Sequence, residues 1–152
     1  MMRFAFGTVV CLMLAACGDP SAATKPTSTA QVGTAGSGLN AIRAEANLPP
    51  VRRNAVLDGV AKGHAQDMLR KGFFGHKGSN GSTVGKRVER AGYRWCSVAE
   101  NIAKGFPTRE ATIEQWRKSP SHYKNLTKRR VKEYGIAQVG DIWVMVLAAK
   151  RC

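Results

Sequence analysis

The chain has 152 residues, with 24 Lys and Arg against 10 Asp and Glu, and a formal net charge of +14. This length fits one domain and leaves little room for two hydrophobic cores. A hydrophobic content of 43% with 22% charged residues excludes disorder of the whole chain. The excess of basic residues predicts attraction to anionic partners without naming one.

The beginning of the chain has the layout of an export signal. Arg3 precedes an apolar run that ends in the letters LAAC at residues 14–17. The run is shorter than the roughly 20 apolar residues of a membrane span, so residues 1–16 are interpreted as a signal peptide. The LAAC ending resembles the lipobox of bacterial lipoproteins, which predicts acylation of Cys17, with palmitate for example, and stable membrane attachment. An ordinary signal peptide cut nearby and an uncleaved anchor are the alternatives.

A tether is expected between this leader and the folded part. Residues 18–38 are rich in Ser, Thr, Ala, Gly and Pro, and such a composition cannot bury enough surface to fold. The predicted organisation is a signal peptide over 1–16, a lipidated Cys and flexible tether over 17–38, and one folded domain over 39–152. The folded domain holds 22 of the basic and 9 of the acidic residues, so nearly all the charge belongs to it.

Export would also determine the state of the four cysteines. Cys11 would leave with the signal peptide and Cys17 would carry lipid, so Cys96 and Cys152 remain as an even pair in an oxidising compartment. We predict a disulfide between them, which the chain-entropy model values at about 4 kcal/mol for a loop of this size. Two free thiols are the alternative.

Four helices are expected before any strand. Their ends are indicated by capping residues at the start and by Gly or Pro at the stop. The first predicted helix covers residues 39–47 and stops before Pro49, and the second covers 54–72, from the cap Asn54 to Gly72. The third covers 83–91 and stops at Gly92, and the fourth runs from the cap Thr108 to just before Pro120.

Two strands are expected at the end of the chain. Residues 133–139 and 142–149 predict a hairpin that turns at Gly140 and Asp141. The second strand, IWVMVLAA, is apolar at every position, which indicates a strand covered on both faces. The expected fold class is therefore α+β, a three-layer α-β-α sandwich with a small antiparallel sheet between helices.

Three histidines and one glutamate are the candidates for chemistry. His64 lies on the apolar stripe of the second helix, which favours a histidine of the core or of a cavity wall. His76 lies in a loop after that helix, where it can point outward, and His122 lies near the start of a short helical turn that runs through Leu126. Glu100 lies in the apolar segment AENIA, so we expect a cation or hydrogen-bond donors beside it.

His76, Glu100 and His122 could supply three ligands to a divalent ion such as zinc and leave a position for water. Their spacings of 24 and 22 residues differ from the local HExxH pattern of zinc proteases. A hydrogen-bonded His-Glu-His cluster is equally consistent with these residues.

Several short motifs resemble a known family in order and spacing: HAQDM, FFGH, GYRW, AENIA, WRKSPSH, YKNL, and YGIA followed by IWV. They are similar to the CAP domain, the superfamily of cysteine-rich secretory proteins, antigen 5 and pathogenesis-related 1, in its short bacterial form. The resemblance covers nearly all of residues 39–149 and implies an α-β-α sandwich. It also implies a central cleft, lined by two His and two acidic residues, that binds zinc or another divalent ion in several members.

Carried over to this chain, the resemblance places His76, Glu100 and His122 in the cleft. The second acidic position falls on Ser119, so one general base of the family pattern is missing. His64 matches a position that bacterial relatives often fill with His, and we expect it at the cleft wall. Asn101 and Ser119 are expected to support the cleft residues.

The favoured function is a binding module, lipid-anchored in the cell envelope on its periplasmic or outer surface, that holds a lipid or an anionic envelope component. Five clustered cations are expected to carry the binding: Lys124, Lys128, Arg129, Arg130 and Lys132. A solvated basic face without a partner is the simpler interpretation of the same residues. Export argues against nucleic acid as the partner, and the sequence predicts no oligomeric state.

A metal-dependent, peptidase-like hydrolase is the alternative function. In it, a divalent ion at the three cleft residues would activate water. No residue of the motifs is an evident general base, and Ser119 or Ser121 paired with His122 is adjacent in sequence without a demonstrated orientation. Whether the protein is an enzyme therefore stays open, and a cluster that only stabilises its loops is a further alternative.

Overall fold

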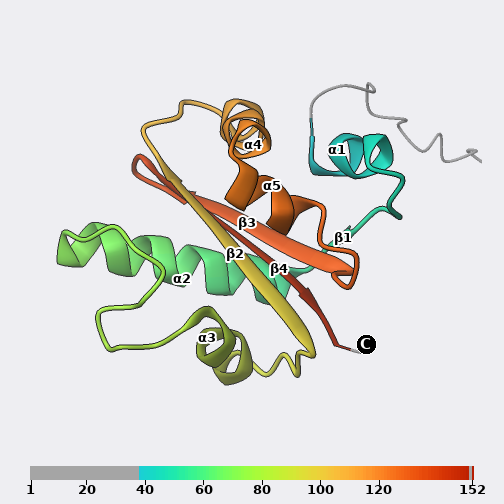
Figure 1. The fold of residues 1–152 in the computed structure, drawn as a ribbon. Helices are drawn as coiled ribbons and strands as arrows, with labels where there is room; N and C mark the ends of the chain where they lie inside the picture. Colours follow the sequence, from blue (N-terminus) through green and yellow to red (C-terminus); the bar gives the residue numbers. More distant parts are fainter. Residues whose placement is uncertain (1–37, 151) are drawn as a thin grey trace, which may run out of the picture. The chain divides into compact units, whose positions relative to one another are not determined.

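The computed structural model describes residues 38–150 and 152, so the predictions for the leader, for Cys17 and for most of the tether lie outside the described residues. Five helices and four strands make up the described part (Figure 1). In chain order they are α1 (Leu39–Glu45), β1 (Arg52–Arg53), α2 (Ala55–Lys71), α3 (Val84–Arg90), β2 (Ser97–Lys104), α4 (Arg109–Lys118), α5 (Pro120–Leu126), β3 (Glu133–Val139) and β4 (Ile142–Ala149).

The predicted capping residues of three helices form the expected bonds, whereas α1 ends at Glu45, two residues before its predicted end. The side chain of Asn54 accepts hydrogen bonds from two backbone N–H groups in the first turn of α2. Thr83 and Thr108 cap α3 and α4 in the same way. Gly72 ends α2 in the left-handed conformation, at φ 65°, which glycine adopts without strain.

The sheet has four strands in the order β1-β3-β4-β2. The hairpin of β3 and β4 is confirmed with the predicted bounds, and β4 also pairs antiparallel with β2 over the full length of both strands. The short β1 pairs parallel with β3. The strands β1 and β2 were not predicted, because β1 is only two residues long and β2 carries two polar residues, Glu100 and Asn101, at its centre.

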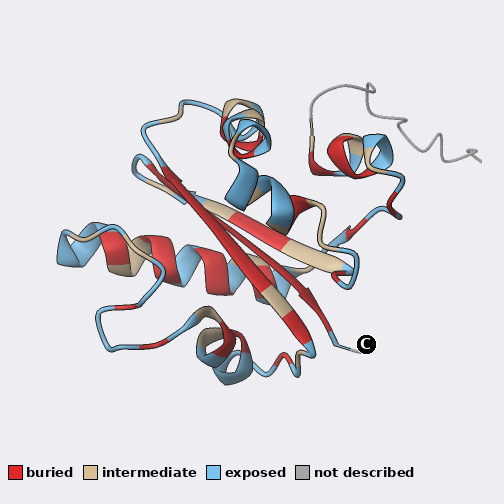
Figure 2. Cartoon of the chain, viewed as in Figure 1, coloured by how far each residue is buried: buried red, intermediate tan, exposed pale blue. Residues whose placement is uncertain are grey.

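Helices cover both faces of the sheet, which confirms the α-β-α sandwich. On one face α2 and α3 pack against Val144, Val146 and Ala148 of β4. On the other face α1, α4 and α5 pack against Trp143, Met145 and Leu147. Figures 1 and 2 show β4 buried along its length between the two helical layers. This is why the strand is apolar at every position.

One disulfide and one close backbone contact hold the layers in place. Cys96 and Cys152 form the predicted disulfide, which ties the end of the chain to the segment before β2. Gly135 of β3 lies directly against the backbone of Leu57, where a Cβ atom would have no room. No helix among the described residues is long and apolar enough to cross a membrane.

Candidate functional site

Glu100 is the centre of a polar cluster on β2. Its side chain is 2% exposed. The guanidinium of Arg87 donates from Nη2 to Oε2 at 2.7 Å, and His76 Nδ1 lies 2.9 Å from Oε1. A buried carboxylate is costly to the fold unless it is paired. Glu100 therefore has beside it a cation, one of the two kinds of partner expected from the sequence, and it comes from α3.

Arg87 is the residue that sequence reasoning missed. Besides binding Glu100, it donates from Nη1 to the backbone carbonyls of His76, at 3.1 Å, and Ser82, at 2.8 Å. It thus fixes the loop that carries His76 to the strand that carries Glu100. The only signal for it was the need of a buried carboxylate for a partner, and that need does not select one of the many basic residues.

His76 is the exposed member of the cluster, with 58% of its side chain accessible. The hydrogen bond to Glu100 raises the pKa of His76, and its burial opposes this effect. Nδ1 of His76 is bonded to Glu100, and its other ring nitrogen, Nε2, has no hydrogen bond to another described residue. His76 is consequently oriented by Glu100 and free to meet a ligand with its other nitrogen.

His64 is buried behind this pair. Its Nε2 donates to the backbone carbonyl of Gly75 at 2.9 Å and lies 3.8 Å from Glu100 Oε1. Burial lowers the pKa of His64, because desolvation disfavours the charged ring. The side chain is 0% exposed, so His64 acts as a neutral wall that holds the loop before His76.

His122 is placed by α5 and by a chain of amide bonds. Asn101 donates to its backbone carbonyl at 3.2 Å, and Asn125 donates to Asn101 Oδ1 at 2.8 Å and to the carbonyl of Glu100 at 3.2 Å. Burial lowers the pKa of His122, and the charge of His76 lowers it further. The expected supporting role of Asn101 therefore has a structural basis, and Asn125 is an additional member.

Ser119 lies against His122. Its Oγ is 2.8 Å from His122 Nδ1 and 3.4 Å from the hydroxyl of Ser121. The Ser–His pair that was only adjacent in sequence is thus oriented in the structure. The contact spans three residues at the start of α5, and no carboxylate in the described part of the chain bonds to His122. This arrangement pairs the side chains of Ser119 and His122 without forming a catalytic triad.

Of the residues predicted to hold a metal, His76 and Glu100 are hydrogen-bonded to each other, whereas the side chain of His122 bonds Ser119 instead. Both oxygens of Glu100 are engaged, one by Arg87 and one by His76. In the range 38–150 and at 152, no group of three His, Cys, Asp or Glu has an arrangement that could hold an ion. Ligation by all three predicted residues would require Glu100 to release a partner, so this conformation does not fit a three-ligand site.

The five predicted cations form a surface that we call the basic segment. Lys124 lies on α5, two residues after His122, and the others follow between α5 and β3. Four are exposed and Lys128 is half-buried. Within residues 38–150 and 152, none of the five forms an ion pair. The members are Lys124, Lys128, Arg129, Arg130 and Lys132.

The sandwich, with one histidine on a loop, two on helices and a glutamate on the edge strand, defines the CAP class of proteins. Residues 37–142 match the profile of the CAP family, described as the cysteine-rich secretory protein family. The chain therefore belongs to this family.

Two curated relatives are both from Bacillus subtilis. An uncharacterized protein, YkwD, is 29% identical over 113 residues, which cover 73% of this chain and 44% of the relative. An uncharacterized membrane protein, YlbC, is 27% identical over 97 residues, which cover 64% of this chain and 28% of the relative. The chain thus spans less than half the length of these relatives.

Solved structures share the fold. An extracellular protein with an SCP domain from Bacillus anthracis is 28% identical, has a TM-score of 0.71, and matches over 74% of this chain and 38% of its own. An outer surface protein from Borrelia burgdorferi is 21% identical, with a TM-score of 0.69, and matches over 74% of this chain and 87% of its own. The second likeness establishes the fold alone.

Proposed function

We propose that the protein is a lipid-anchored CAP domain of the cell envelope that binds an anionic envelope lipid or polymer. The observation that carries this proposal is the basic segment. Five cations lie within nine residues, and none has a carboxylate partner in the described part of the chain. Each would add about 1 kcal/mol of attraction near an anionic surface, so the segment can act as a unit.

The position of the basic segment supports the same function. It begins on α5, the helix that also carries His122. A ligand held electrostatically by the basic segment would therefore lie close to the helix that carries this histidine. The LAAC sequence of residues 14–17 and the extracellular setting named for the Bacillus anthracis protein support an exported domain.

Vesicle binding tests the proposal. The full chain should sediment with vesicles of phosphatidylcholine and phosphatidylglycerol at least about tenfold more tightly than with phosphatidylcholine alone, and added salt should reduce the difference. The acyl anchor contributes equally to binding of both kinds of vesicle, so the ratio of the two affinities measures the contribution of charge. Changing all five residues of the basic segment to Gln should abolish most of the preference.

The control variant separates a local surface from net charge. It changes three Lys and two Arg elsewhere to Gln, which gives the same change in charge on exposed residues of α2, α3 and the segment after α3. Those residues are Lys62, Arg70, Lys71, Lys86 and Arg94. An equal loss in both variants would contradict the proposal, because any cations would then serve. The matched variant should keep most of the preference for anionic vesicles.

A divalent ion remains a separate prediction. The unused nitrogen of His76 and a nitrogen of His122 would be the ligands, and Glu100 could join only after releasing Arg87. Metal analysis of the purified chain against a His76→Ala, His122→Ala double variant tests it. Metal that stays unchanged in the double variant would contradict the site, and metal lost from it would reopen the hydrolase as the function.

A further inference from the structure

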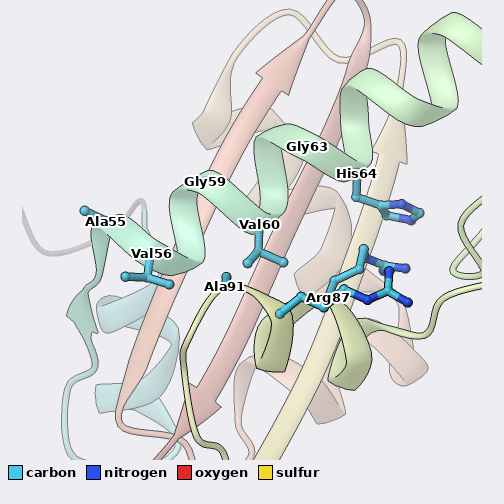
Figure 3. Close-up of a pocket in the computed structure, with 9 residues that line it drawn as sticks. Ala55, Val56, Gly59, Val60, Gly63, His64, Arg87 and Ala91 are labelled. Carbon is cyan, nitrogen blue, oxygen red and sulfur yellow. The ribbon is translucent and has the colours of Figure 1, made fainter.

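A second surface feature is the outer edge of β3, the strand that lies between β1 and β4 in the sheet. β1 is only two residues long and pairs with β3 as far as Tyr134. Figure 3 shows α2, from Ala55 to His64, crossing one face of the sheet rather than running along this edge. Beyond Tyr134, β3 therefore has no neighbouring strand on its outer side among the described residues.

Backbone groups on this edge are only partly satisfied. Alternate residues of a strand direct their N–H and C=O groups to opposite sides. On the side away from β4, the carbonyl of Tyr134 accepts from the N–H of Asn54 at 2.8 Å. The N–H of Ile136 donates on the same side to Asp58 Oδ1, also at 2.8 Å. By this alternation Gln138 faces outward as well, and the Asp58 carboxylate replaces the missing strand at one N–H group only.

The end of the edge carries backbone groups that have no partner in the described part of the chain. They are the carbonyl of Ile136, the N–H and carbonyl of Gln138, and the N–H of Gly140. The carbonyl of Gly140 is already bonded, by Gln138 Nε2 at 3.1 Å. Both Gln138 and Gly140 are exposed, and a hollow of about 310 Å³, lined by Arg53 and Trp143 among others, opens beside the strand. Unpaired groups on an accessible edge are a template for another strand.

We propose that this edge pairs with the same edge of a second copy of the chain, antiparallel and about a two-fold axis at Gln138. Each Gln138 N–H then donates to the Gln138 carbonyl of the other copy, and each Gly140 N–H donates to the Ile136 carbonyl of the other copy. The N–H of Ile136 and the carbonyl of Gly140, which face each other in the same register, keep their internal bonds. The free groups are thus self-complementary, as a two-fold interface requires.

The side chains around the edge also suit a second copy. Two chains of net charge +14 repel each other, but the two arginines that line the hollow are each paired with a carboxylate, Arg53 with Asp58 and Arg109 with Glu110. Leu69 of α2 is 48% exposed and lies against the turn that ends β3, where a second copy would cover part of it.

A strand from another protein is the poorer occupant of this edge. It would satisfy the same backbone groups, but no feature of the edge selects its sequence, whereas the two-fold pairing follows from the positions of the free groups. The inference does not rest on the proposed function, because residues 136–140 include no member of the basic segment.

Sedimentation equilibrium of the full chain in a non-ionic detergent tests the dimer. The paired stretch is short, so the interface is small and the measurement has to reach about 1 mM chain. Gln138→Pro removes the outward N–H without removing a bond to β4, and proline is tolerated on edge strands. It should keep the melting temperature and weaken dimerisation by at least about tenfold. Gln138→Thr loses the same side chain but keeps the N–H, so it is the matched control and should dimerise within about threefold of the natural chain.

A cross-link tests the register independently of stability. Directly paired residues of an antiparallel ladder have Cα atoms about 5.5 Å apart, within the range of about 4.4–6.8 Å that a disulfide spans. Gln138→Cys should therefore give a disulfide-linked dimer under mild oxidation. Lys86→Cys lies on α3, which packs beside β2 at the opposite edge of the sheet, and it should give only the background of the natural chain.

Three results would overturn the proposal. The natural chain could stay monomeric up to about 1 mM. Gln138→Pro could dimerise as well as Gln138→Thr, or Lys86→Cys could cross-link as well as Gln138→Cys, and either result would assign the dimer to another surface. Saturable binding of a synthetic peptide with the sequence of residues 133–139, by a chain that stays monomeric, would assign the edge to a strand from another protein.

Discussion

Charged side chains are arranged in opposite ways at the Glu100 cluster and in the basic segment. Glu100 is 2% exposed, and both of its oxygens are bonded, one by Arg87, which is itself only 12% exposed. In the basic segment five cations reach solvent and form no ion pair among the described residues. Burial imposes pairing on a charge, whereas exposure permits it to stay unpaired. The cluster is therefore the part that the fold depends on, and the basic segment is the part available to an external anion.

The largest effect is expected when the pairing of Glu100 is broken. Arg87→Leu leaves a buried carboxylate without its cation and two backbone carbonyls without their donor. Removing one partner of a buried pair costs about 3–5 kcal/mol in the free energy of unfolding. Urea denaturation should show this loss at neutral pH.

An exposed arginine on the same helix is the control for that change. Arg90 lies three residues after Arg87 on α3. Arg90→Leu should alter the unfolding free energy by no more than about 0.5 kcal/mol. The double variant Arg87→Leu, Glu100→Leu should recover part of the loss, because no uncompensated charge remains. A loss below about 1 kcal/mol for Arg87→Leu alone would show that the cluster is not essential to the fold.

Glu133 is half-buried, between the buried Glu100 and the exposed basic segment, and it gives a pH-dependent prediction. It accepts a hydrogen bond from Tyr93 at 2.6 Å and another from Asn54 at 3.1 Å. The bond from Tyr93 is the main reason that the pKa of Glu133 is lowered from 4.5. A lowered carboxyl pKa stabilises the fold above the unfolded value, and the contribution is lost as the pH falls through the folded value.

Tyr93→Phe removes this bond and should lower the unfolding free energy by about 1 kcal/mol at neutral pH. The difference between the natural chain and the variant should shrink as the pH falls below 4.5, where protonation weakens the same bond. Urea denaturation of both proteins across this range measures it. A difference that stays constant with pH would mean that the tyrosine acts through packing alone.

The elements that local chemistry specifies were predictable, and those that depend on distant partners were not. Asn54 and Gly72 mark the ends of α2 through bonds within a few residues, and β4 is apolar on both faces because both are covered. At the centre of β2, Glu100 and Asn101 are buried but polar, so the strand lacks an apolar pattern.

The same limit applies to the candidate site. His76, Glu100 and His122 could be named from motifs, and the sequence could state that Glu100 needs a partner. It could not choose Arg87, because only the packing of α3 beside β2 brings that side chain to Glu100.

The smallest effect on stability is expected in the basic segment. Changing its five residues to Gln removes no ion pair among the described residues, and each change should shift the unfolding free energy by less than about 0.5 kcal/mol. The sum should be near zero or slightly stabilising at low salt, because repulsion among neighbouring cations falls. Urea denaturation at low and high salt measures this, and the salt dependence should be weaker in the variant. Large destabilisation would contradict the comparison, since it would give these cations a structural role. Loss of anionic vesicle binding at unchanged stability would assign them to the partner.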